Sequence, residues 1–207
     1  MTTQGTVRLG EPVTERDHVR GIRTAQVSLV EYGDFEYPYC RAAQAIIDGL
    51  MKASGDQLSL TFRHFPLRKV HPHSQRAAEV SEAANSEGKF WAMHDKLFAN
   101  QEALDDASLV RYAAEISVDA GRVARELDSH QHASRVAEDY MSGLKSGVNG
   151  TPTFYIDGTR YDGPVALRDM FTSIPEQHLE LQVAGRFAAS PRIPRVNWSG
   201  TPGPPRA

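Results

Sequence analysis

The hydrophobic period changes twice between residues 26 and 64, and this pattern constrains the fold more than any other feature of the chain. Residues 26–32 (QVSLVEY) are apolar and β-branched, as in a strand buried on at least one face. Residues 40–53 carry Ile and Leu at helical spacing, and residues 57–64 (QLSLTFRH) alternate again. A crossover of this length joins two parallel strands through a right-handed connection. We therefore predict an α/β fold built on a βαβ unit.

The next part of the chain changes character. It is rich in Ala and in charged residues, and its apolar positions recur at helical spacing, which is typical of a packed helical bundle rather than a cofactor site. The predicted helices are residues 74–88, 89–100, 105–116, 119–129 and 132–147. Strand signals then return at 153–157 and 159–163, with Gly158 as the hairpin turn, and residues 164–174 predict a last helix.

These segments predict four parts. Residues 1–20 form an N-terminal arm, residues 21–70 and 147–175 form one sheet-and-helix domain, and residues 71–146 form an all-helical module inserted into it. Residues 176–207 form a tail that contains Pro and Arg and is too poor in apolar residues to pack alone.

Composition excludes several function classes. The chain has 207 residues, and 23 basic against 26 acidic side chains give a formal charge of −3, so no net positive field attracts nucleic acid or an anionic membrane. The first 21 residues lack a signal-peptide pattern, and apolar runs stay far below the ~20 residues that span a bilayer. We therefore expect a cytoplasmic protein whose partners are other proteins, peptides or small molecules.

A single cysteine, Cys40, excludes an intrachain disulfide and a four-thiolate zinc site. It follows Asp34–Tyr39 (DFEYPY) and stands at the start of the predicted helix, where free N–H groups and the helix dipole favour a thiolate. Two readings stay open from the residues alone. The thiol is either a buried, inert side chain or a reactive group.

Four stretches together resemble the bacterial DsbA-like branch of the thioredoxin superfamily. They are LVEYGDFEYPYC, FRHFPL, HPHSQRAAEVSEAANSEGKFWAMHDKLF and GVNGTPTFYIDG, in the family's order, and the resemblance covers residues 10–173. It implies a thioredoxin-like fold with an inserted all-helical module. It also implies an active site that reads Cys-Pro-Tyr-Cys, opposite a Thr-Pro pair whose proline is cis.

Tyr37 breaks this resemblance. Pro38, Tyr39 and Cys40 match the last three motif positions, and Thr151 and Pro152 match the cis-proline pair, but Tyr37 stands where the family has its attacking cysteine. A phenol with a pKa near 10 does not attack disulfides.

Two functions remain. In the first, Cys40 is catalytic and performs monothiol exchange with an external thiol, which is a low-molecular-weight thiol or a protein or peptide thiol or disulfide. In the second, the protein is redox-inactive and binds an extended peptide or a small ligand in a groove formed by Tyr37, Pro38, Tyr39, Thr151 and Pro152, with the backbone of Thr151 free to pair with the peptide.

Other groups of residues give weaker evidence of a functional site. His64, His71 and His73, with Asp34 and Glu36, are metal-ligating residue types, but a strand and the loop after it do not guarantee that they converge. We expect no metal and no cofactor, since phosphate-binding glycine loops and serine-nucleophile motifs are also absent from the sequence. A homodimer in which the tail from residue 186 embraces a second copy is a further hypothesis.

Overall fold

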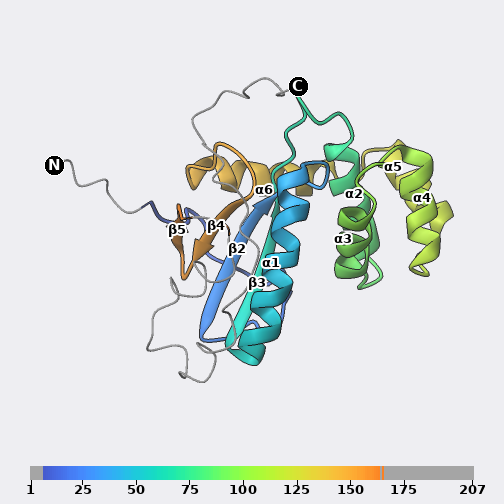
Figure 1. Ribbon diagram of the computed structural model, residues 1–207. Coiled ribbons are helices and arrows are strands. Elements are labelled where there is room, and N and C mark those ends of the chain that lie inside the picture. Colours follow the sequence, from blue (N-terminus) through green and yellow to red (C-terminus); the bar gives the residue numbers. More distant parts are fainter. Residues whose placement is uncertain (1–6, 164, 166–207) are drawn as a thin grey trace, which may run out of the picture.

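The computed structural model describes residues 7–163 and residue 165. Within them, five strands form one mixed sheet at the centre of the molecule (Figure 1). In sheet order the strands are β1 (His18–Arg20), β3 (Leu58–His64), β2 (Val27–Gly33), β4 (Thr153–Ile156) and β5 (Thr159–Tyr161). The pair β2 and β3 is parallel, as the βαβ pattern predicts, and the other neighbouring pairs are antiparallel.

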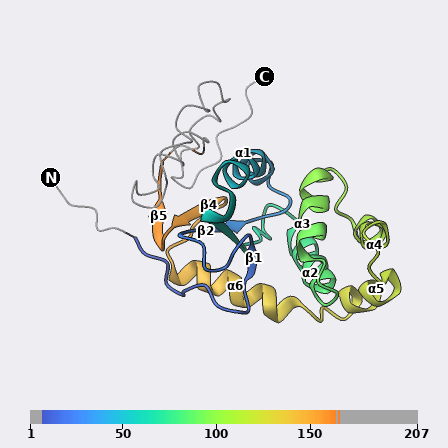
Figure 2. The same cartoon turned by 90° about the horizontal axis from the view of Figure 1, so that it is seen from below.

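Two helices cover the two faces of this sheet. Helix α1 (Pro38–Ser54), followed by the short 3₁₀ helix η1 (Gly55–Gln57), packs Ile47 and Leu50 against Leu29 and Leu60 on one face. Helix α6 (Ala133–Lys145) covers the other face, as the view from below shows (Figure 2). Because both faces are covered, all seven residues of β3 are buried. The alternation in the sequence reveals only one of these two buried faces.

The remaining helices form a group beside the β1 edge of the sheet (Figure 2). They are α2 (Ser74–Asn85), α3 (Phe90–Ala99), α4 (Asp106–Glu115) and α5 (Ala120–Asp128). Their core is continuous with the sheet, because Phe90 and Phe98 belong to the same buried cluster as Phe35 and Phe62. The α/β architecture with an inserted helical module is therefore confirmed, but α6, which the sequence placed in that module, covers a face of the sheet instead.

The segment before β1 is fastened to the sheet by a buried ion pair. The Arg63 guanidinium donates to Asp17 through Nε at 2.7 Å and Nη2 at 3.1 Å. It also donates to the backbone carbonyls of Glu11 and Pro12, each at 2.9 Å. An alternating strand places Arg63 on the face opposite Leu60 and Phe62, so the chain needs this acidic partner to bury it.

The hairpin between β4 and β5 turns at Gly158, as predicted, but Asp157, which was expected to end the strand, also belongs to the turn. Asp157 and Gly158 have φ values of 47° and 71°, as expected for a tight hairpin turn that matches the twist of its strands. The helix expected at residues 164–174 and the tail at 176–207 lie outside the described residues.

Candidate functional site at the amino end of α1

Cys40 is the third residue of α1 and has no exposed surface. The backbone N–H of Asp34 points to its sulfur, with 3.5 Å between nitrogen and sulfur. The sulfur belongs to the same buried cluster as Phe35 and Phe62. The thiol therefore has no surface that a disulfide in solution could reach.

The helix start does not make this thiol acidic. Burial raises the pKa of Cys40 well above its usual value, and the nearby Glu31 carboxyl acts in the same direction. The Asp34 N–H and the Thr151 side chain lower this pKa by less than burial raises it. Of the two readings left open by the sequence, the buried thiol is the favoured one, because the loss of hydration outweighs the field of the helix end.

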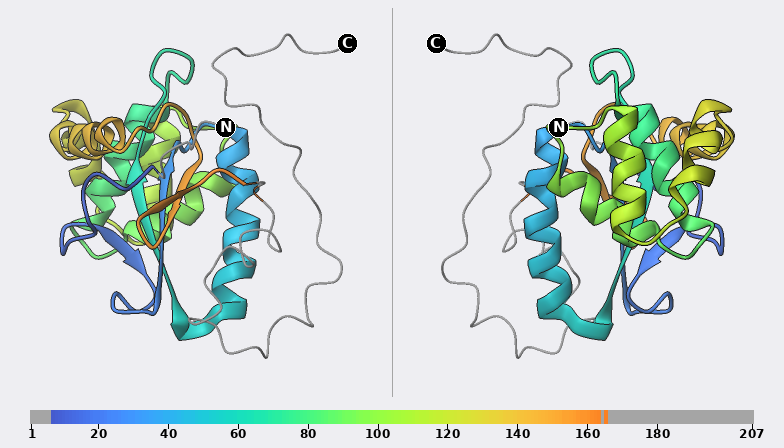
Figure 3. Two further views of the ribbon diagram at one scale, coloured as in Figure 1. Left: turned by 90° about the vertical axis from the view of Figure 1, so that its left-hand side faces the viewer. Right: turned by 90° about the vertical axis from the view of Figure 1, so that its right-hand side faces the viewer.

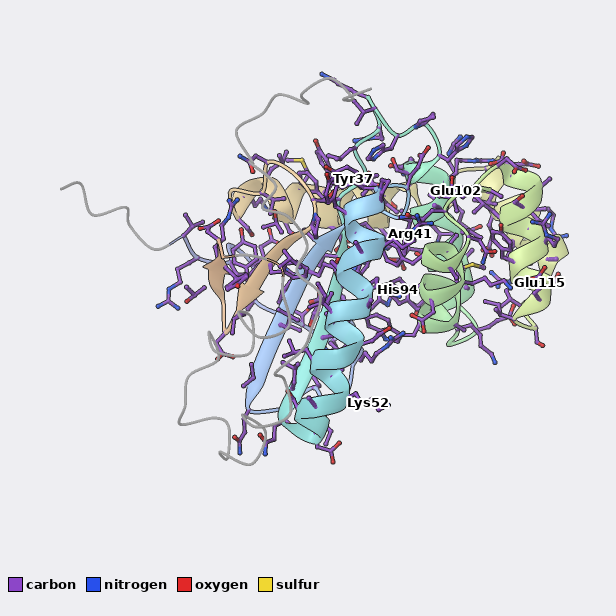
Figure 4. The ribbon with its side chains drawn as sticks, in the orientation of Figure 1. Tyr37, Arg41, Lys52, His94, Glu102 and Glu115 are labelled. Carbon is purple, nitrogen blue, oxygen red and sulfur yellow. The ribbon has the colours of Figure 1, made fainter. Side chains whose placement is uncertain are left out.

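Tyr37 occupies the position just before the helix, and Pro38 begins α1. The Tyr37 ring is half-buried, and its centroid lies 5.2 Å from the ring centroids of both Tyr39 and His71. Burial, followed by the neighbouring Tyr39, Cys40 and Asp34, raises the pKa of the Tyr37 phenol. The phenol is therefore a neutral group at the amino end of α1, where Figure 4 shows it above Arg41.

The turn that carries Tyr37 is held by a buried carboxylate. Asp34 accepts hydrogen bonds from the backbone N–H groups of Glu36 and Leu67 and interacts with His71 Nδ1, each at 2.8 Å. The hydrogen bond with Asp34 raises the pKa of His71, although partial burial opposes this change. The loop after β3, which carries His71, extends past the amino end of α1 (Figure 3).

The helical module also holds this turn. Gln101 lies just after α3. Its side-chain amide donates to the backbone carbonyls of Phe35 at 2.6 Å and Tyr37 at 3.0 Å. Sequence reasoning missed Gln101, because a polar residue in a loop gives no sign of what it contacts across the fold.

The Thr151–Pro152 pair lies beside the thiol, and the peptide bond between these residues is cis. Thr151 has no exposed surface, and Pro152 is also buried. Strand addition at the Thr151 backbone would therefore require the residues that cover it to move.

The metal-ligating residues near the turn do not converge. His71 pairs with Asp34, and Glu36 accepts a hydrogen bond from the backbone N–H of His73 at 2.7 Å. His64 instead contacts Glu82, a partner that sequence reasoning did not consider.

Glu31 is the second group that sequence reasoning missed. It lies on β2 with no exposed surface, and the Gln44 amide donates to its carboxyl oxygens at 3.0 and 3.3 Å. Burial raises the pKa of Glu31 to about 8. The signal was present as a lone acidic residue in the apolar strand VSLVEYG.

Comparison with known proteins agrees with this geometry. A family model described as Thioredoxin matches residues 13–175. The fold resembles oxidised BdbD from Bacillus subtilis, with a TM-score of 0.76 and 24% identity over 84% of this chain and 98% of that chain. It also resembles a thioredoxin-like oxidoreductase from Silicibacter pomeroyi, with a TM-score of 0.70 and 26% identity over 79% of this chain and 93% of that chain.

The chain belongs to the DsbA-like branch of the thioredoxin family. A further member of similar fold is α-DsbA1 of Wolbachia pipientis, with a TM-score of 0.69 and 18% identity, covering 81% of this chain and 92% of that chain. The thioredoxin-like fold predicted from the sequence is thereby confirmed.

The curated relatives of this DsbA-like chain carry a different name. This chain is 41% identical over 173 residues to the Na(+)/H(+) antiporter NhaA 3 of Salinispora tropica. It is 44% identical over 162 residues to the Na(+)/H(+) antiporter NhaA 1 of Salinispora arenicola. These matches cover 83% and 78% of this chain but 26% and 25% of the antiporters, so the chain spans about a quarter of their length. Among the described residues, no helix has the length and apolar character that crossing a membrane requires.

Proposed function

We propose that this DsbA-like protein is redox-inactive and binds extended peptide segments at the amino end of α1. The observation that carries the proposal is the fully buried Cys40 sulfur in a chain that has no second cysteine. A dithiol cycle needs an exposed attacking thiol and a second thiol to resolve the mixed disulfide, and a neutral phenol at residue 37 supplies neither. Monothiol exchange with an external thiol is the less favoured alternative, because the buried Cys40 must first be uncovered.

Exposed apolar side chains around the turn support the binding role. Tyr39 is 41% exposed, and Val70, in the loop that carries His71, is 67% exposed. Together with Tyr37 they offer two rings and an aliphatic side chain, which suit the side chains of a peptide. In the proposal Pro38, which is exposed, belongs to this surface, while Thr151 and Pro152 are buried and do not pair with the peptide.

The redox part is tested with Tyr37→Cys. Placing a thiol at residue 37, beside His71 and ahead of Cys40, rebuilds the family's motif, so we expect disulfide exchange with a reporter such as insulin in this variant only. The wild type should show no more disulfide exchange than a Cys40→Ser control. In the wild type, Cys40 should react with maleimide below pH 8 only after unfolding. Native labelling of Cys40 below pH 8, or exchange by the wild type, would overturn the redox-inactive assignment.

The binding part is tested by selecting ligands from a peptide array and measuring their affinity by fluorescence anisotropy. Tyr39→Ala should weaken binding about tenfold or more, as for the loss of an aromatic anchor. Met141→Ala, which truncates a 50% exposed side chain on α6, is the matched control and should have no effect. Cys40→Ser should bind as the wild type does. Equal losses in the Tyr39 and Met141 variants would contradict this binding surface.

A second candidate is a role as partner of a Na(+)/H(+) antiporter. It is favoured by the 40–44% identity to part of NhaA-type antiporters. In this proposal the chain is located at the cytoplasmic side, and the bound peptide belongs to the antiporter. We expect the purified chain to bind the NhaA-type antiporter of its own organism in detergent, more weakly with Tyr39→Ala. Absence of binding, together with unchanged transport in vesicles, would remove this candidate.

A further inference from the structure

A second polar cluster lies inside the molecule, outside the site at the start of α1. His18 on β1, His64 on β3 and Glu82 on α2 are 7%, 1% and 5% exposed. Glu82 Oε1 lies 2.8 Å from His18 Nε2 and 2.9 Å from His64 Nε2. One ligand atom from each residue lies within 4.8 Å of the others. Three elements distant in sequence thus place two imidazoles and a carboxylate around one point.

The rings around this cluster fix its orientation. The His18 ring is stacked on Phe90, with 3.5 Å between centroids and 7° between planes. Phe62 lies edge to face with His64, with centroids 5.6 Å apart. Side chains held in this way lose little freedom when they bind a ligand, which is the condition for a tight metal site.

The donor set matches a transition metal. Imidazole nitrogens with a carboxylate oxygen are ligands for Zn²⁺, whereas Mg²⁺ and Ca²⁺ take oxygen ligands. We propose that His18, His64 and Glu82 bind one divalent transition-metal ion, with Zn²⁺ as the best match. This departs from our sequence-based expectation of no metal and is independent of the peptide-binding role.

The charges around the cluster allow the ion. Glu82 is buried, and its Oε1 faces the Nε2 atoms of both histidines. Arg135 Nε lies 3.9 Å from the same oxygen, but Arg135 also pairs with Asp139, and the carboxylate keeps lone pairs for a metal. Because the ligands join β1, β3 and α2, the ion would stabilise the fold.

The test uses the full, untagged chain, freed of metal with a chelator. Zn²⁺ titrated by calorimetry should bind at one equivalent, and a Zn²⁺ concentration a hundredfold above the Kd should raise Tm by about 5–10 °C. Co²⁺ should give the visible absorption bands of a site with nitrogen ligands. No Zn²⁺ effect on Tm and no Co²⁺ bands in the folded wild type would overturn the proposal, whatever the variants do.

Variants then locate the ion. Glu82→Gln and His18→Gln, each checked for folding by circular dichroism, should lose at least tenfold in Zn²⁺ affinity. The control is the double variant His130→Ala/His132→Ala, which removes two histidines that pair with other glutamates and should bind as the wild type does. If Glu82→Gln or His18→Gln fails to fold, the Co²⁺ bands seen in the wild type must still appear in the double variant His130→Ala/His132→Ala. Loss of Zn²⁺ binding or of the Co²⁺ bands in that control would overturn the assignment.

Discussion

At the scale of single residues, one side chain separates this chain from the motif of its family. Tyr37 replaces a thiol, yet Asp34, His71, Pro38 and Cys40 surround it with charge and packing suited to a reactive group. This is why Tyr37→Cys is expected to gain activity rather than to unfold the protein. The ring is only half-buried, so the smaller side chain leaves no large closed cavity.

Glu31 gives a pH-dependent prediction at the same scale. Its pKa is about 8 in the folded protein, against an ordinary value of 4.5 for a glutamate side chain. Between these pH values the unfolded chain releases the proton that the folded chain keeps. The free energy of unfolding should therefore fall as pH rises from about 4.5 to about 8, by an amount on the order of a few kcal/mol, and then level off.

Glu31→Gln tests this dependence, because the amide keeps an oxygen that can accept from Gln44 but carries no titrating proton. Urea unfolding at pH 5 and pH 9 should show a smaller decrease in stability in Glu31→Gln than in the wild type. Glu15→Gln, which changes a side chain that is 91% exposed, is the control and should keep the wild-type slope. Equal slopes in all three proteins would refute the raised pKa.

At the scale of elements, the ion pair between Asp17 and Arg63 fastens the N-terminal segment to β3. Asp17→Asn would leave the buried guanidinium without its charged partner, and we expect a loss of about 3–5 kcal/mol of unfolding free energy. Glu138→Gln breaks the exposed pair of Glu138 with Arg16 and should cost about 1 kcal/mol or less. Denaturant unfolding measures both, and similar losses in the two variants would contradict an anchoring role.

Most elements were predicted from the sequence, but their contacts were not, and β1 (His18–Arg20) was missed because it lies in the segment expected to be an N-terminal arm. Hydrophobic period located β2, α1, β3 and the five later helices, because the side chains that face the core repeat with the period of each element. The burial of Cys40, by contrast, depends on Thr151 and on a turn held by Gln101, which lie 111 and 61 residues further along the chain. No local pattern encodes such contacts, so the sequence left the state of the thiol open.

At the scale of the whole molecule, the sheet and the helical module share one buried core. Phe62 on β3 lies 5.1 Å from Phe35 and 4.8 Å from His94 of α3, measured between ring centroids. We therefore expect the module and the sheet to unfold together. Phe62→Ala should lower Tm by on the order of 10 °C in a single transition.

Two probes check this cooperativity. Far-ultraviolet circular dichroism follows all helices, and Trp91 fluorescence, measured in a Trp198→Phe background, follows the junction of α3 with the sheet. The two curves should coincide in the wild type and in Phe62→Ala. Separate midpoints would mean that the module and the sheet are independent folding units.

The hydrogen bonds from Gln101 have a mechanical consequence. The Gln101 amide, just after α3, donates to the carbonyls on both sides of Glu36, so the helical module cannot move away from the sheet without breaking the hydrogen bonds that hold the turn of Tyr37.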